Sequence, residues 1–181
     1  GDDPACNQSN AKIVSYSWKK TAAAGFDIVG WTGNATNRTI SHSLGVVPEM
    51  MLVKLRGAAD VWKVYHKDLG NTKFLMLNTD DGAQTESGNW NDTTPTSSVI
   101  SIGTDNAVNK NSTDVIAYLF ASVAGYSKFG SYEGNGNQDG PFIYTGFKPA
   151  WVLIKNADAG SSYWNLHDNK RDTYNPVNTV L

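Results

Sequence analysis

The stretch Gly45-Val46-Val47-Pro48-Glu49-Met50-Met51-Leu52-Val53-Lys54 has a counterpart 101 positions later in Gly146-Phe147-Lys148-Pro149-Ala150-Trp151-Val152-Leu153-Ile154-Lys155. The glycine, the proline, one leucine and the final lysine are identical in the two stretches, and Gly33-Asn34 recurs as Gly134-Asn135 at the same spacing. Ala24-Gly25 recurs as Ala124-Gly125 at a spacing of 100, and Trp62 recurs as Trp164 at 102. Short loop insertions produce such drift, so the sequence predicts an internal repeat.

The repeated residues indicate how each copy folds. Gly45 and Pro48, like Gly146 and Pro149, form a corner that leads into a strand, because glycine permits a positive φ and proline fixes φ. The apolar strand that follows ends in Lys54 or Lys155. A polar turn then leads to a second strand that opens with Trp62 or Trp164, so each copy is predicted to form a hairpin with a core tryptophan.

Other segments also favour strands, because they are short, rich in β-branched and aromatic residues, and bounded by Gly, Asn, Asp or Pro. They are Val61–Tyr65, Lys73–Leu77, Ser98–Ile102 and Val115–Phe120. Only Ala22-Ala23-Ala24 favours a helix, and Gly25 ends it. The sequence therefore predicts an all-β chain, a β-sandwich of the jelly-roll or concanavalin-like type.

The repeat divides the chain into an N-terminal extension (1–24), a first β-sandwich unit (25–124) and a second unit (125–181). The first unit continues into two strands that have no counterpart in the second, so the second copy is predicted to be incomplete. An incomplete sandwich exposes unpaired strand edges, which strand donation between subunits would cover.

The charge, the apolar runs and the cysteine content of the chain exclude several classes of function. Of 181 residues, 18% are charged and the net charge is −2, with no basic stripe of the kind that binds nucleic-acid phosphates. No apolar run approaches the length of a membrane span, which is about 20 residues. Cys6 is the only cysteine, so the chain forms no internal disulfide. A polar, nearly neutral surface is typical of extracellular and virion β proteins.

A longer pattern carries a family resemblance. It comprises Tyr132-Glu133-Gly134-Asn135-Gly136, the stretch from Gly140 to Lys155, and Trp164 followed by Asp168, Arg171 and Asn175-Pro176. This pattern resembles a domain of unknown function found, often in tandem, in predicted tail, fibre and other virion proteins of phages, notably marine ones. The first unit resembles it more loosely, since His66 stands where the second unit has Asp168. The resemblance implies a particle component and no known activity.

Candidate ligand sites are few. Trp90, inside the long loop from Asn78 to Thr96, and Trp31 are candidates for stacking on a sugar, although Trp90 folded back on the core is the alternative. Asn135, Asn137 and Asp139 alternate as in the opening of a calcium loop, but the later Glu is missing and a plain turn is the alternative. We expect no other cofactor.

These observations favour a non-enzymatic virion or extracellular protein, a tail, fibre or decoration component that assembles with copies of itself or with other particle proteins. The alternative is a carbohydrate-binding module for a host glycan. The carboxylates lie in turn sequences and suggest no glycosidase pair, so we expect no enzyme, no nucleic-acid partner and no membrane insertion.

Overall fold

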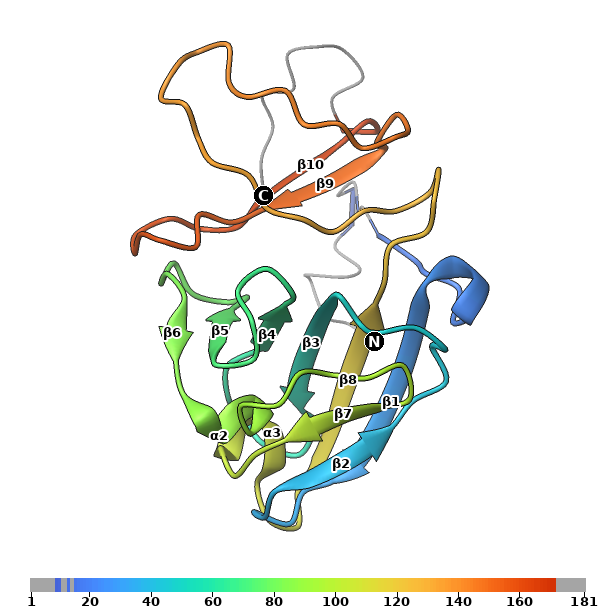
Figure 1. Cartoon of the computed structure of the whole chain (residues 1–181), viewed down its shortest axis with the longest axis vertical. Helices are drawn as coiled ribbons and strands as arrows, with labels where there is room; N and C mark the ends of the chain where they lie inside the picture. Colours follow the sequence, from blue (N-terminus) through green and yellow to red (C-terminus); the bar gives the residue numbers. More distant parts are fainter. Residues whose placement is uncertain (1–8, 11–12, 14, 172–181) are drawn as a thin grey trace.

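A computed structural model of the chain describes residues 9–10, 13 and 15–171, and these residues fold mainly into β-strands (Figure 1). The strands are β1 (Phe26–Thr32), β2 (Arg38–Ser41), β3 (Met50–Leu55), β4 (Lys63–His66), β5 (Lys73–Met76), β6 (Gln84–Thr85), β7 (Val99–Ile102), β8 (Asp114–Phe120), β9 (Trp151–Ile154) and β10 (Asn165–Asp168). Six of them form one antiparallel sheet in the order β1-β8-β3-β4-β5-β6. Two small sheets, β2–β7 and β9–β10, complete the described fold.

The main core lies on one face of the large sheet. Alternate residues of the central strands β3 and β8 point into it, among them Met51, Val53 and Leu119, which are fully buried. The β2–β7 pair contributes Ile100 and Ile102 from the opposite side. Burial of these apolar side chains supplies most of the folding free energy of this part, because apolar surface removed from water is the dominant favourable term.

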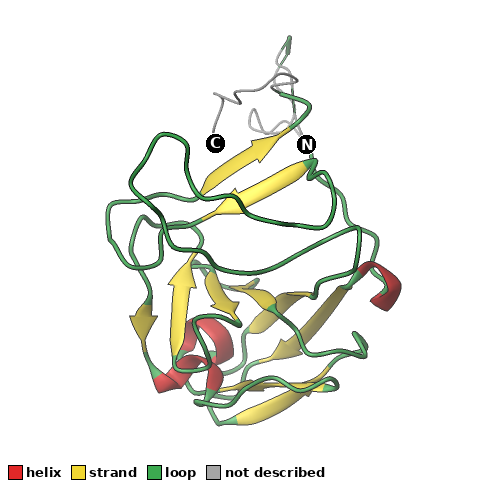
Figure 2. Cartoon of the chain, turned by 45° about the horizontal axis from the view of Figure 1, so that its top comes forward, coloured by secondary structure: helices red, strands yellow, loops and turns green. Residues whose placement is uncertain are grey.

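Three short helical segments accompany the strands (Figure 2). A 3-10 turn at Ala22–Ala24 ends at Gly25, as expected, with a φ of 64° at the glycine. The helices α2 (Ser87–Trp90) and α3 (Asn106–Asn109) are single turns that close the end of the main core. Sequence patterns did not predict them, because four residues are too few to show helical periodicity.

The opposite face of the large sheet carries a second, smaller apolar cluster. Met50, Val64 and Leu75 form its buried part, and Leu153 of β9 and Trp164 pack against it. The β9–β10 pair therefore lies against this face of the large sheet and contacts it through side chains, as a sheet of its own.

Both predicted hairpins form, and their registers match. In the first, β3 and β4 pair Leu52 with Val64. In the second, β9 and β10 pair Leu153 with Leu166, which stand 101 and 102 positions further along the chain. Each second strand begins one residue after its tryptophan, Trp62 or Trp164.

The mainly β fold predicted from the sequence is confirmed, with one six-stranded sheet and two small sheets. The strand β1 was missed because Gly30 and the buried Asp27 break its apolar pattern. The long loop 78–96 contains β6 and α2. Cys6 and Asn175-Pro176 lie outside the described residues.

Candidate functional site

The two tryptophans considered for sugar stacking are both part of the core. Trp90 is 0% exposed, its indole N–H donates to the carbonyl of Lys73 at 2.9 Å, and its ring meets Tyr65 edge to face. Trp31 is 7% exposed and donates to the carbonyl of Val108. Trp90 therefore adopts the arrangement given above as the alternative, folded back on the core. It is the last residue of α2, and its ring points into the core. With at most 7% of either residue exposed, neither indole presents a stacking face on the surface.

The glycine-rich loop considered for calcium is exposed and locally bonded. The side-chain oxygen of Asn135 accepts from the backbone N–H of Asn137 at 3.0 Å, and the carbonyl of Asn137 accepts from Gly140. The first bond is that of an Asx turn, in which an asparagine side chain stabilises a bend without a metal, and the second is the backbone bond of a β-turn. Asp139 is exposed in the same loop. Across the described part of the chain, no three His, Cys, Asp or Glu residues cluster as a metal site.

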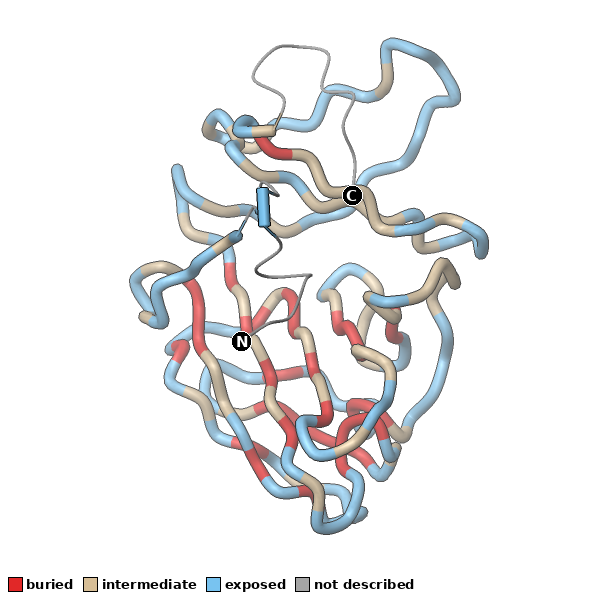
Figure 3. The backbone as a smooth tube through the Cα atoms, turned by 180° about the vertical axis from the view of Figure 1, so that it is seen from behind, coloured by how far each residue is buried: buried red, intermediate tan, exposed pale blue. Residues whose placement is uncertain are grey.

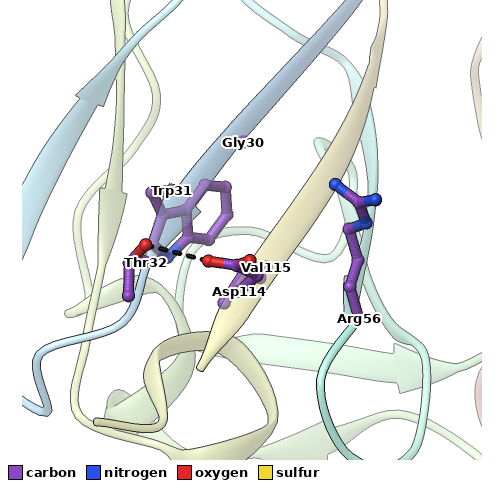
Figure 4. Close-up of a pocket in the computed structure, with 6 residues that line it drawn as sticks. All are labelled: Gly30, Trp31, Thr32, Arg56, Asp114 and Val115. Atoms are coloured by element: carbon purple, nitrogen blue, oxygen red, sulfur yellow. Dashed lines mark hydrogen bonds between the residues drawn. The ribbon is translucent and has the colours of Figure 1, made fainter. Parts of the chain in front are cut away.

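A hollow of about 270 Å³ lies where β1, β8 and the end of β3 meet (Figure 4). Its lining residues are Gly30, Trp31, Thr32, Arg56, Asp114 and Val115. The hydroxyl of Thr32 donates to the carboxylate of Asp114 at 2.9 Å, and the guanidinium of Arg56 points away from that pair. With one carboxylate among its lining residues, the hollow lacks the pair that glycoside hydrolysis uses.

A buried lysine forms a charged cluster beneath α2 and α3. The Lys63 ammonium lies 3.7 Å from a carboxylate oxygen of Glu86 and 3.7 Å from one of Asp105, and it sits 3.7 Å above the ring of Phe74. Asp105 also caps α3 by accepting from the N–H of Ala107. The cluster ties β4 to the residues that begin both helices, which is a structural role, since burying an ammonium group requires such partners.

The β9–β10 hairpin is held in place by aromatic side chains. The indole N–H of Trp164 donates to the carbonyl of Met76 at 2.8 Å, which anchors the start of β10 to β5. On the other side of the hairpin, Trp151 meets Trp18 edge to face at 5.8 Å and Tyr16 at 6.3 Å. Because Trp18 also packs against Phe26 and Phe120, residues 16–18 join the β9–β10 hairpin to the large sheet.

Asp168, at the end of β10, is the best-connected polar side chain of the hairpin. Its carboxylate accepts from the Arg171 guanidinium, from the Tyr16 hydroxyl at 2.8 Å, and from the backbone N–H groups of Lys170 and Arg171. The side-chain and backbone hydrogen bonds from Arg171 hold the pKa of Asp168 well below its ordinary value, although burial opposes this. These bonds occupy the carboxylate fully, so Asp168 braces the turn after β10.

The outer edge of β9 offers unpaired backbone groups. In an antiparallel strand, the backbone N–H and C=O groups of successive residues point alternately to the neighbouring strand on one side and to the neighbouring strand on the other. Asn169 donates to the carbonyl of Ala150, which places Ala150 and Val152 in bonded pairs facing β10. Trp151 and Leu153 therefore direct their N–H and C=O groups to the other side, where no described strand pairs with them.

Exposed aromatic side chains are concentrated in the segment before β9 and in the loop before β10. They are Tyr126, Tyr132, Phe142, Tyr144 and Tyr163, with Phe142 90% and Tyr144 72% exposed. The Lys128 ammonium lies over the Tyr144 ring, 5.6 Å from its centre. These residues leave several large apolar groups in contact with water in this part of the chain.

The strands and the unpaired outer edge of β9 define a β-rich domain whose second hairpin is open on one side. The family model for a domain of unknown function, DUF7483, matches residues 1–181, and the chain belongs to that family. No curated protein and no solved structure matches the chain. Within the described residues, no helix has the length and apolar character needed to cross a membrane.

Proposed function

We propose that the protein is a non-enzymatic structural component of a virion, a tail, fibre or decoration protein that assembles with copies of itself or with other particle proteins. The observation that carries the proposal is the β9–β10 pair, a two-stranded sheet with unpaired backbone groups at Trp151 and Leu153. A two-stranded sheet is marginally stable alone, and an open edge is a template for another strand.

Two further features support this assignment. The stretch from Tyr132 to Lys155 resembles a domain of phage particle proteins, and that stretch leads directly into the open edge. We also propose that the two hairpins are copies of one β-sandwich module, because their registers match residue for residue. Tandem copies of one module suit extended particle proteins, in which each unit contacts its neighbours.

The test is to locate the chain on particles. An antibody raised against the purified chain is applied to purified virions and viewed by immunogold electron microscopy, with pre-immune serum as the control. Labelling of a defined part of the particle supports the proposal. Particles that lack the label while their other proteins are detected contradict it, and release of sugar from host polysaccharide by the purified chain contradicts the non-enzymatic assignment.

The second candidate is a carbohydrate-binding module, and a separate observation favours it. Tyr144 and Tyr163 are 72% and 68% exposed, and tyrosine rings on a surface can stack on sugar faces. A glycan array with the wild-type chain and the Tyr144→Ala and Tyr163→Ala variants tests this. Binding that both variants weaken supports the module, and no binding at high protein concentration removes it.

A further inference from the structure

We propose that the side chains of Lys63 and Asp105 condense to an isopeptide bond, a covalent cross-link between β4 and the start of α3. The carboxylate of Glu86 carries the proton that the reaction moves. The cross-link requires no cofactor and no second molecule. It goes beyond the proposed function and does not depend on it, because all three side chains belong to the buried cluster beneath α2 and α3.

The Lys63 ammonium is buried without a close partner. Its side chain is 7% exposed, and its nitrogen Nζ lies 3.7 Å from Oδ2 of Asp105 and 3.7 Å from Oε2 of Glu86. Both distances are longer than that of a hydrogen bond, and a buried charge without hydrogen bonds is costly. An amide made from the ammonium and a carboxylate is neutral, so condensation removes two charges from this interior.

The backbone segments that carry the reacting groups are held in place. Lys63 lies in β4, where it pairs with Val53 of β3 and with Met76 of β5. The backbone N–H of Asp105 donates to the carbonyl of Gly88 in α2 at 2.9 Å. Groups fixed side by side react as if at effective molarities of about 10⁵–10⁸ M, which offsets the unfavourable condensation of an amine with a carboxylate in water.

The surroundings activate the carboxyl group of Asp105. Its Oδ1 accepts from the backbone N–H of Ala107 at 2.6 Å, and this hydrogen bond draws electron density from the carboxyl carbon. Its Oδ2 is the oxygen nearest the Lys63 nitrogen and therefore the one that leaves. The ring of Phe74, 3.7 Å from that nitrogen, shields it from water. Glu86 is exposed on its outer side, which gives the released water a path out.

The reaction balances without a further reactant. Glu86 takes a proton from the Lys63 ammonium, the freed nitrogen lone pair forms a bond to Cγ of Asp105, and the bond from Cγ to Oδ2 breaks. The ammonium begins with three hydrogens, of which the amide keeps one and the departing Oδ2 takes two as water. Glu86 ends in the ionised state in which it began, so the step consumes neither an oxidant nor a reductant.

A buried asparagine supports the role of Glu86. Asn89 is fully buried, and its Nδ2 donates at 3.2 Å to Oε2 of Glu86, the same oxygen that faces Lys63. Its own Oδ1 has no hydrogen-bond partner among the described residues. A buried amide oxygen requires a donor, and the proton that Glu86 takes from Lys63 supplies one beside it. Asn89 therefore positions the ionised carboxylate and stabilises its protonated form.

Mass spectrometry of the purified chain tests the cross-link. We expect the denatured chain to be lighter than its sequence by one water, about 18 Da. Trypsin does not cut after a modified lysine, so the digest should contain a branched peptide of residues 57–67 and 74–110, whose fragmentation places the link at Asp105.

Three variants separate the cross-link from mere packing. Glu86→Gln keeps both reacting side chains and cannot take the proton, so it should fold, as judged by circular dichroism, and have the full mass. Lys63→Arg keeps the charge without the amine and should also have the full mass. Glu133→Gln, which changes an exposed carboxylate outside the cluster, is the matched control and should retain the cross-link.

A wild-type chain of full mass, or a lighter chain without the branched peptide, overturns the inference. A link at Asn89 with loss of ammonia, about 17 Da, overturns it as well, because the acceptor would then be a different residue. A folded Glu86→Gln variant that is cross-linked as completely as the wild type contradicts the role of Glu86. None of these results bears on whether the chain is a virion component, which the labelling of particles tests separately.

Discussion

The two hairpins have the same local design and differ in what surrounds them. Each follows a glycine with a positive φ, 74° at Gly45 and 85° at Gly146, and each second strand starts after a tryptophan. Yet β3–β4 lies in the middle of a six-stranded sheet, whereas β9–β10 stands alone. Burial follows this difference, with buried residues along β3 and mostly half-buried or exposed ones in β9–β10 (Figure 3). Local sequence therefore specifies a hairpin, and neighbouring strands decide how far it is buried.

The largest contrast is expected between Met51 and its counterpart Val152. Met51 is 0% exposed and Val152 is 36% exposed. Met51→Ala should lower the free energy of unfolding by about 3 kcal/mol, because it leaves a cavity in the core. Val152→Ala should change the free energy by less than about 0.5 kcal/mol. Urea unfolding followed by circular dichroism measures both, and similar losses would show that the second hairpin is as tightly packed as the first.

The next contrast is between Gly25 and Gly125, which stand 100 positions apart. Gly25 and Gly125 have φ values of 64° and 72°. A Cβ at Gly25 would overlap the carbonyl oxygen of Ala121, whereas a Cβ at Gly125 would meet open space.

Gly25→Ala should therefore cost more than about 2 kcal/mol, from overlap and backbone strain together. Gly125→Ala should cost only the strain, about 1 kcal/mol. Thermal unfolding of the two variants compares them. A Gly125→Ala variant that is the less stable of the two contradicts the contrast.

For the lysines that close the hairpin loops, we expect the larger loss of stability in the second hairpin, the reverse of the two contrasts above. The Lys155 ammonium donates to the carbonyls of Asp80, Asn156 and Ser162, and the Lys54 ammonium donates to the carbonyl of Asp60. Lys155→Met should destabilise its hairpin by about 1 kcal/mol, and Lys54→Met by about 0.5 kcal/mol. Amide hydrogen exchange of β4 and β10 reports each hairpin separately. A larger effect at Lys54 would mean that loop closure matters more in the buried hairpin.

The smallest contrast is in pH dependence. Burial lowers the pKa of His66 below its ordinary value of 6.5, although Asp68 opposes the shift. A depressed histidine pKa stabilises the fold above the unfolded value, and this contribution is lost as the pH falls through the folded pKa. For Asp168 the corresponding loss begins only below the ordinary aspartate value of 3.8.

The first hairpin should therefore weaken below pH 6.5, and the second only below pH 3.8. Hydrogen exchange at pH 7.5 and pH 5.5 tests this, with His66→Asn as the control that removes the titration. Equal acid sensitivity of the wild type and the variant would assign the effect to another group.

The strands were predictable where the sequence repeats or alternates. The runs that became β3, β5, β7, β8 and β9 are apolar and bounded by turn residues, so local pattern was enough. The candidate sugar site was not predictable in the same way. Whether Trp90 is exposed depends on Tyr65 and Lys73, which the chain brings to it from β4 and β5. The open edge at Trp151 and Leu153 became visible only with the strand order.

The sequence by itself determined the two hairpins, their glycine corners and their tryptophan starts, because these depend on φ preferences and on side chains close together in the chain. The tertiary structure alone decided that β8 lies between β1 and β3, and that β10 is the one described strand beside β9. Strand order joins segments that are far apart, such as β1 and β8, and their pairing depends on the packing of the whole sheet. No local pattern in the sequence contains that information.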